Sequence, residues 1–251
     1  MTTAADRPGI ASSYQRLRAA QKSGKGAPLY SRLVNRPAGR VLAAIAHNLG
    51  LTPNAVTAIS AVFTYAAIVC LFVLPPTPAT AALVTVGLVL GYALDAADGQ
   101  LARLRGGGTL SGEWLDHVVD SGKIASLHLG VAVMMFRWYD LAPVWLLVPI
   151  GFSIFGVIHF FGMLLTEFFT RLAYARRQLE APAAGTANTL MSALKLPTDY
   201  GILCLVFAFL ALPTTFLVLY GLLGLATAGY TVIVFGVWYR RVRALDAGPT
   251  A

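Results

Sequence analysis

The sequence is poor in charged residues and has almost no cysteine. Asp, Glu, Lys and Arg make up only 12% of its 251 residues, whereas a soluble domain usually contains about 25%. Hydrophobic residues reach 57%, and the mean hydropathy is +0.69. These values exclude an ordinary soluble domain and predict a protein with several membrane spans. The two cysteines, Cys70 and Cys204, both lie in apolar runs, which favours buried thiols over a disulfide or a metal pair.

The N-terminal segment, residues 1–27, lacks the apolar core that a cleavable signal peptide requires. It carries basic side chains instead, namely Arg7, Arg16, Arg18, Lys22 and Lys25. We therefore expect no cleaved leader here, and we predict that this segment is basic and flexible.

Six runs of the sequence approach the roughly 20 apolar residues that a membrane-spanning helix needs. They lie near 53–74, 79–103, 112–137, 143–170, 198–212 and 214–238. We predict an all-α integral membrane protein with six transmembrane helices over 51–243 and a C-terminal tail over 244–251.

Basic residues are distributed unevenly between the two sides of these spans. Of the 19 Lys and Arg residues, Arg137 alone falls in a connection on the second side. Because cytoplasmic loops are enriched in Lys and Arg, we predict that both termini and the loops after the second and fourth helices are cytoplasmic. We expect a multi-pass protein of a bacterial plasma membrane, with no nucleic-acid partner.

Residues 28–50 have the pattern of an amphipathic helix that precedes the first span. Apolar residues recur at helical spacing, while Arg32, Arg36 and Arg40 occupy another face. This pattern predicts a helix in the cytoplasmic membrane interface whose arginines contact lipid phosphates. The alternative is a solvated helix packed on the rest of the protein.

Four of the eleven acidic residues fall within 26 positions of this apolar chain, namely Asp95, Asp98, Asp116 and Asp120. A carboxylate at membrane depth is unfavourable unless it is paired, hydrated or bound to a cation. Spacings of three and four residues place each pair on one face of a helix. Two facing pairs would make an oxygen-only site that favours Mg²⁺ or Mn²⁺. The alternatives are a polar packing network and a cation translocation path.

The residues around these aspartates form a longer pattern that resembles the signature of the CDP-alcohol phosphotransferase family. It consists, with no departure in spacing, of Asp95, Asp98, Gly99, Ala102, Arg103, Gly112, Asp116 and Asp120. The resemblance implies an enzyme of phospholipid synthesis that passes a substituted phosphoryl group from a CDP-linked donor to an alcohol and releases CMP. It also implies a homodimer and an active site between the second and third helices, facing the cytoplasm.

The same resemblance implies roles for individual residues. Asp95, Asp98 and Asp116 would be the main ligands of two divalent cations, and Asp120 would complete the metal site or act as general base. Contacts to the nucleotide or its phosphates would come from Gly99, Ala102, Arg103 and Gly112. Apart from the motif, Asn54 at the cytoplasmic start of the first helix is a further candidate for nucleotide contact, with capping or polar packing as the alternative. The loop after Arg103 contains three glycines, 106–108, which indicate either a permissive turn or backbone N–H groups for phosphate.

The sequence leaves the donor and the acceptor open. CDP-diacylglycerol with a polar alcohol is the favoured pair, but Gly112-Glu113-Trp-Leu-Asp116-His117 also resembles enzymes that join CDP-choline or CDP-ethanolamine to diacylglycerol. Candidate acceptor ligands are Lys123, Arg171, Arg176, Arg177, Lys195 and His117. The basic residues among them have an alternative role in setting topology and contacting anionic lipid.

Two other classes of function fit a membrane protein with buried aspartates. One is a cation-coupled transporter, and the other is a scaffold that keeps a metal site without catalysis. Release of CMP would distinguish the transferase from both, while a transporter would show substrate-dependent cation flux in sealed vesicles.

Overall fold

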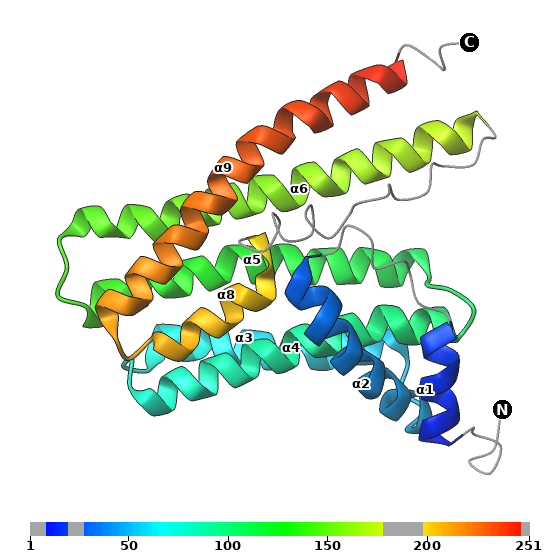
Figure 1. The fold of residues 1–251 in the computed structure, drawn as a ribbon, viewed down its shortest axis with the longest axis horizontal. Coiled ribbons are helices and arrows are strands. Elements are labelled where there is room, and N and C mark those ends of the chain that lie inside the picture. The colour runs from blue at the N-terminus through cyan, green and yellow to red at the C-terminus, as the bar shows by residue number, and fades with distance from the viewer. Residues whose placement is uncertain (1–8, 20–27, 178–197, 247–251) are drawn as a thin grey trace.

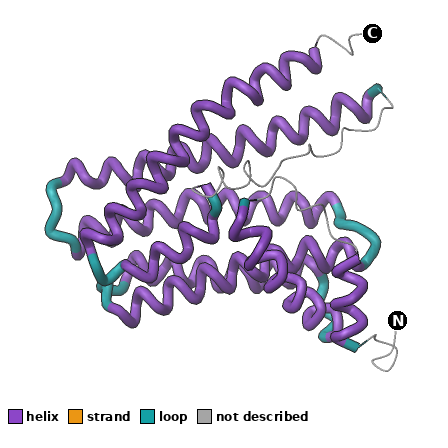
Figure 2. Tube along the Cα trace, in the orientation of Figure 1, coloured by secondary structure: helices purple, strands orange, loops and turns teal. Residues whose placement is uncertain are grey.

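A computed structural model describes residues 9–19, 28–177 and 198–246, and every regular element in these ranges is helical (Figures 1 and 2). The N-terminal elements are α1 (Ile10–Ala19), the π-helical turn η2 (Ser31–Asn35) and α2 (Arg36–Asn48). Three long helices follow, α3 (Pro53–Val73), α4 (Pro78–Leu104) and α5 (Leu110–Trp138). The chain continues with η3 (Pro143–Leu146), α6 (Leu147–Arg176), α8 (Tyr200–Val206), η5 (Phe207–Phe209) and α9 (Pro213–Asp246).

Five of these helices are long and apolar enough to cross a membrane, namely α3, α4, α5, α6 with the preceding η3, and α9. The protein is therefore an integral membrane protein, as predicted. The fifth apolar run of the sequence forms only a short helix, Tyr200–Phe209, and the residues just before 198 lie outside the described part. Six spans thus stay a prediction.

The helix starts follow the capping residues in the sequence. Thr52 accepts a hydrogen bond from the Ala55 backbone N–H at 3.1 Å, and Pro53 occupies the first helical position of α3. Thr109 accepts one from the Gly112 backbone N–H, also at 3.1 Å, at the start of α5. A threonine cap satisfies a donor that the first turn leaves unpaired. These caps fix where α3 and α5 begin relative to the aspartates.

Small residues bring α3 and α4 into close contact. A Cβ added to Gly87 would lie 2.9 Å from Ala67 Cβ, and one added to Gly91 would lie 2.1 Å from Thr64 Oγ1. Ser60 Oγ donates a hydrogen bond of 2.8 Å to the Gly91 carbonyl. Glycines four residues apart allow helices to approach closely in membranes, and here they align α3 with the aspartate-bearing half of α4.

The described part of the N-terminal segment contains a helix. Within the segment expected to be flexible, Ile10–Ala19 form α1, because Ser13 and Leu17 are buried against α2 and its surroundings. At the other end of the chain, α9 continues to Asp246, past the expected start of a tail. The remaining division of the chain into segments stays a prediction.

Helix α2 lies across the end of α4 that carries the aspartates (Figure 1). A Cβ added to Gly39 would lie 2.9 Å from Ala96 Cβ, so this glycine allows the two backbones to meet. Small residues face α4 while Val41 and Ile45 are exposed. The structure thus shows a helix at the predicted position, and its location in the membrane interface stays a prediction.

Helix α9 crosses α6, and the pair packs on α5 through α6 (Figure 1). A buried polar contact joins these elements, because His128 Nδ1 on α5 lies 2.6 Å from the Tyr220 hydroxyl on α9. The His128 ring also stacks on Phe152 of α6, with centroids 4.1 Å apart. Aromatic rings therefore fill the centre of the bundle, away from the aspartates.

Candidate metal and phosphate site

The four aspartates come from facing stretches of α4 and α5, as their spacing predicts. Asp95 interacts electrostatically with Asp98, Asp116 and Asp120. The ammonium of Lys123 lies between the helices, 2.7 Å from Asp95 Oδ1 on α4 and 2.5 Å from Asp120 Oδ1 on α5. One cation thus already contacts carboxylates from both helices.

Asp98 is buried and is held from a third helix. Thr57 Oγ1 on α3 lies 2.6 Å from Asp98 Oδ2, and both side chains are buried. An ionised carboxylate only accepts hydrogen bonds, so the hydroxyl is the donor. The close α3–α4 packing described above is what brings these two residues together.

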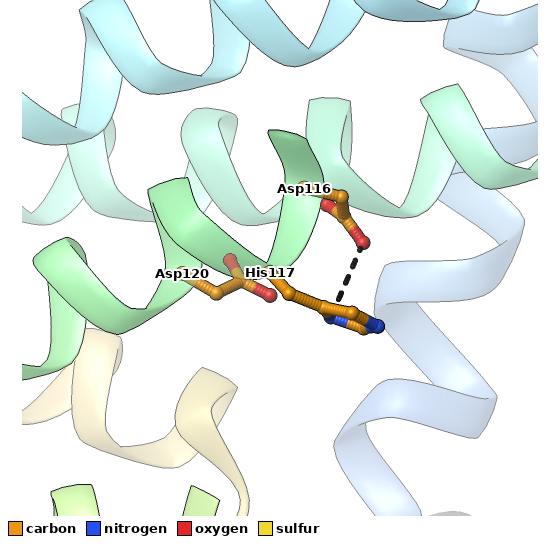
Figure 3. A group of neighbouring side chains, drawn as sticks. All are labelled: Asp116, His117 and Asp120. Carbon is orange, nitrogen blue, oxygen red and sulfur yellow. Dashed lines mark ion pairs between the residues drawn. The ribbon is translucent and has the colours of Figure 1, made fainter. Parts of the chain in front are cut away.

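The carboxylates on α5 form a second group with a histidine. Ligand atoms of Asp116, His117 and Asp120 all lie within 4.8 Å of one another. Figure 3 shows these three side chains projecting from neighbouring turns of α5, with the ion pair between Asp116 and His117 at 4.0 Å. His117 also lies 3.8 Å from Glu113. The group offers mostly carboxylate oxygen, with one imidazole at its edge.

A cavity of about 310 Å³ adjoins the aspartates on the side of α2. It brings together motif residues from α4 and α5, namely Asp95, Asp98, Gly99, Arg103 and Asp116. Its other walls are made by Ser31, Asn35, Arg36, Tyr92, Ala96 and Gln100. The cavity therefore has carboxylates and two guanidinium groups in one lining, which suits a ligand that carries both phosphate and bound cations.

Arg36 lines the cavity, although the sequence pattern predicts that it contacts lipid. The pattern places it on lipid phosphate, but it lines the cavity and is close enough to Arg103 for the two charges to repel. Arg40 from the same face lies over the Tyr14 ring, 5.4 Å from its centroid. Both positions follow from α2 packing on α4 and α1. Helical spacing shows that these arginines share a face, but it does not show what that face meets.

Other cavity residues were also missed, among them Ser31, Asn35 and Tyr92. Asn35 is buried at the junction of η2 and α2, where no motif marks it. Tyr92 offered the one usable signal, because it lies three residues before Asp95 and so shares a face with it. Its ring stacks near Tyr30, with centroids 6.4 Å apart.

Two predicted nucleotide contacts lie next to each other, at the starts of α3 and α5. A Cβ added to Gly112 would lie 3.0 Å from Asn54 Oδ1, so the glycine leaves room for Asn54 at the start of α3. Neither residue lines the cavity described above. The structure therefore brings Asn54 and Gly112 together, and their contact with nucleotide stays a prediction.

The glycines after Arg103 form a turn that ends α4. Gly106 and Gly107 have φ of 97° and 129°, which other residues rarely adopt. The backbone N–H of Gly107 donates to the Ala102 carbonyl at 3.0 Å, and that of Gly106 donates to the Arg103 carbonyl at 3.2 Å. Two of the three glycine N–H groups are thus used within the turn, which favours the permissive turn, and Ala102 is an acceptor in it.

The expected acceptor ligands do not all come together. Arg171 Nη2 on α6 reaches Glu113 Oε1 at the start of α5, at 2.7 Å. Arg176 is exposed, and Arg177 donates a hydrogen bond to the Leu245 carbonyl of α9. Lys195 lies outside the described residues. Among this set, Arg171, Lys123 and His117 are therefore the ones placed near the aspartates of α5.

Comparison with known proteins gives one family and a group of solved structures. The family model described as CDP-alcohol phosphatidyltransferase matches residues 50–238. Structures of Mycobacterium tuberculosis phosphatidylinositol phosphate synthase (PgsA1) are 22% identical. The complex with manganese and citrate covers 83% of this chain and 88% of that chain, with a TM-score of 0.46. The complex with CDP-DAG covers 83% and 93%, also with a TM-score of 0.46. No curated protein matches.

Proposed function

Because the chain belongs to the CDP-alcohol phosphatidyltransferase family, we propose that its aspartate cluster and cavity transfer a phosphatidyl group from CDP-diacylglycerol to an acceptor alcohol. The family match confirms the prediction of a membrane-bound transferase of phospholipid synthesis, in preference to a transporter or a silent scaffold. The observation that carries the proposal is the cavity lining, which combines three motif aspartates with Arg36 and Arg103.

The carboxylates fit Mg²⁺ or Mn²⁺ as resident cations. Their donor atoms are oxygens, which both ions prefer. The ammonium of Lys123 between Asp95 and Asp120 marks a position where a cation is held by both helices. Asp95, Asp98, Asp116 and Asp120 would hold a pair of ions, which when bound would polarise the phosphoryl and hydroxyl oxygens and neutralise the departing CMP.

The protein groups around this position have complementary tasks. Arg36 and Arg103 would bind the diphosphate of the donor from the cavity side, while Gly99, without a side chain, leaves the α4 surface open beside them. The acceptor hydroxyl oxygen would form the new bond to the phosphorus that carries diacylglycerol. The bond between that phosphorus and the CMP oxygen breaks, and the electron pair leaves with CMP. Asp120 or Asp116 would take the hydroxyl proton.

The acceptor would approach from the side of α5 and α6. Arg171 and His117 lie at this side with Glu113 between them, and a phosphorylated alcohol would suit the guanidinium of Arg171. The PgsA1 structures hold CDP-DAG in one case and manganese in another, and the donor and metal proposed here are of the same kinds. A CDP-choline or CDP-ethanolamine donor with diacylglycerol is the second candidate, which the Gly112-Glu113 sequence within the motif favours.

The site faces the cytoplasm in this proposal, with both termini on the same side and α2 in the membrane interface. The distribution of Lys and Arg supports this orientation. The exposed apolar residues Leu33, Val34 and Val41 support an interfacial position for α2. A homodimer in a bacterial plasma membrane completes the proposal.

The decisive experiment measures CMP release by the purified protein in mixed micelles. One reaction contains CDP-diacylglycerol and pooled polar alcohols, and the other contains CDP-choline or CDP-ethanolamine and diacylglycerol, each with Mg²⁺ or Mn²⁺. We expect release in the first reaction, loss with EDTA or in Asp98→Asn, and wild-type release in Asp140→Asn, whose carboxylate is exposed in the loop before α6. Release only in the second reaction would show that the donor is CDP-choline or CDP-ethanolamine and the acceptor is diacylglycerol. No release and no CDP binding would contradict both.

A further inference from the structure

Lys123 is a buried cation in the middle of the aspartate cluster. Only 8% of its side chain is exposed, and its ammonium contacts Asp95 Oδ1 and Asp120 Oδ1 at 2.7 and 2.5 Å. A buried ammonium is strongly unfavourable unless carboxylates compensate it. The pairing also compensates the carboxylates of α4 and α5, which repel one another. Lys123 and the two aspartates are therefore mutually dependent in the metal-free protein.

The same two oxygens would be ligands in a two-cation site. A Mg²⁺ ion that joins Asp95 to Asp120 must approach their oxygens to about 2.0–2.1 Å. The ammonium already occupies the space between these oxygens, so the two cations exclude each other there. Asp98 and Asp116 have no ion pair with Lys123 among the described contacts, and Asp98 is fixed by Thr57 instead. The four carboxylates therefore differ in their contacts, because Lys123 contacts only Asp95 and Asp120 among them.

We propose that Lys123 is a built-in competitor for the second of two divalent cations. Its ammonium holds Asp95 and Asp120 together until that ion binds, and it leaves both oxygens when the ion arrives. The first ion takes the oxygens that Lys123 does not contact. This inference rests on the proposed function, because it requires a divalent site at the aspartates. It assigns the two ions different affinities and makes the weaker one responsive to the cation concentration of the cell.

Titration with Mn²⁺, followed by electron paramagnetic resonance in micelles, tests the proposal without measuring catalysis. We expect wild-type protein to bind two ions in separate steps, the second at least about tenfold weaker, a ratio that corresponds to ~1.4 kcal/mol. In Lys123→Met the second step should tighten by about that ratio, because one positive charge has left the site. The thermal midpoint of the metal-free variant should fall and should rise more steeply with Mn²⁺ than that of wild type.

Arg137→Met is the matched control. Arg137 is a basic residue at the far end of α5, where it donates to the Phe72 carbonyl and lies over the Trp138 ring. This variant removes a cation from the same helix and should leave both Mn²⁺ steps unchanged.

The outcomes separate this inference from the proposed function. If wild type binds Mn²⁺ and folded Lys123→Met binds it with the same two affinities, the inference is overturned and the proposed function stands. If Lys123→Met does not fold, the wild-type titration decides, because two equivalent ions bound in one step contradict competition by Lys123. Wild-type protein that binds no Mn²⁺ overturns both.

Discussion

Thr57 Oγ1 donates a hydrogen bond of 2.6 Å to Asp98 Oδ2, and so ties helix α3 to an aspartate on α4. Both residues are buried, and Asp98 also lines the cavity. Outer partners of this kind fix the orientation of a metal ligand and are often needed for full metal affinity. Thr57 lies outside the family motif, and only the packing of α3 on α4 places it there.

We expect Thr57→Val to weaken Mn²⁺ binding and to lower CMP release by about 10–100-fold, the range seen when such partners are removed. Valine has nearly the same shape but no hydroxyl, so Asp98 loses its donor while the packing is kept. Thr57→Ser retains the hydroxyl and should stay within a few-fold of wild type. Equal loss in both variants would show that the methyl group, rather than the hydrogen bond, is required.

We expect Arg36→Met to raise the KM for the CDP-linked donor by about tenfold or more, since a hydrogen bond to a charged group contributes about 1.5–3 kcal/mol. Arg36 is the first residue of α2, outside the aspartate motif, yet it lines the cavity with Arg103. Arg105→Met is the control, because Arg105 is exposed just beyond α4 and lies outside the cavity. Steady-state kinetics with varied donor check this prediction. An unchanged donor KM in Arg36→Met would remove Arg36 from the proposed diphosphate site.

We expect Arg171→Gln to raise the KM for a phosphorylated acceptor about tenfold, with little change in donor KM or thermal midpoint. Stability should barely change because the ion pair with Glu113 is solvent-accessible, its side chains being 45% and 39% exposed, and such pairs contribute about 0–1 kcal/mol. Arg176→Gln, one turn later and exposed, is the control. A rise in donor KM alone would place Arg171 at the donor instead.

We expect Tyr220→Phe to destabilise the bundle by about 1–3 kcal/mol, the usual effect of leaving a buried hydrogen-bonding group without its partner. The Tyr220 hydroxyl lies 2.6 Å from His128 Nδ1, and both side chains are buried. Tyr239→Phe on the same helix serves as control because Tyr239 is 64% exposed. Thermal unfolding in detergent reports the difference. Metal affinity should be unchanged in both variants, since these rings are remote from the aspartates.

The sequence predicted the parts of this molecule that local spacing controls. Asp95 and Asp98 on one helix, and Asp116 and Asp120 on the next, face each other because three- and four-residue spacings define helix faces. Threonine caps such as Thr52 fix the helix starts for the same local reason. Six apolar runs were predicted as membrane spans, and five of them form helices that are long and apolar enough to cross a membrane.

Contacts between distant segments could not be predicted in this way. Arg36 reaches the cavity because Gly39 lets α2 approach α4, and nothing near Arg36 in the sequence reports that approach. Lys123 was predicted as an acceptor ligand, and its contact with Asp95 joins α5 to α4, which spacing within α5 does not show. The run at 198–212 is apolar enough for a span, but its described helix is short. Apolar composition alone does not set helix length.

The long-range hydrogen bond of Asp199 affects the order in which the parts of the cavity can form during synthesis. Its Oδ1 accepts a hydrogen bond from the Gly201 backbone at the start of α8, and its Oδ2 accepts one from the Ser31 backbone, 168 residues earlier. Ser31 begins the turn that forms one wall of the cavity. The aspartates and their helices are therefore synthesised well before Asp199, the residue that holds this wall through Ser31. A nascent chain that ends before residue 199 carries the whole motif but lacks the residue that anchors this wall of the cavity.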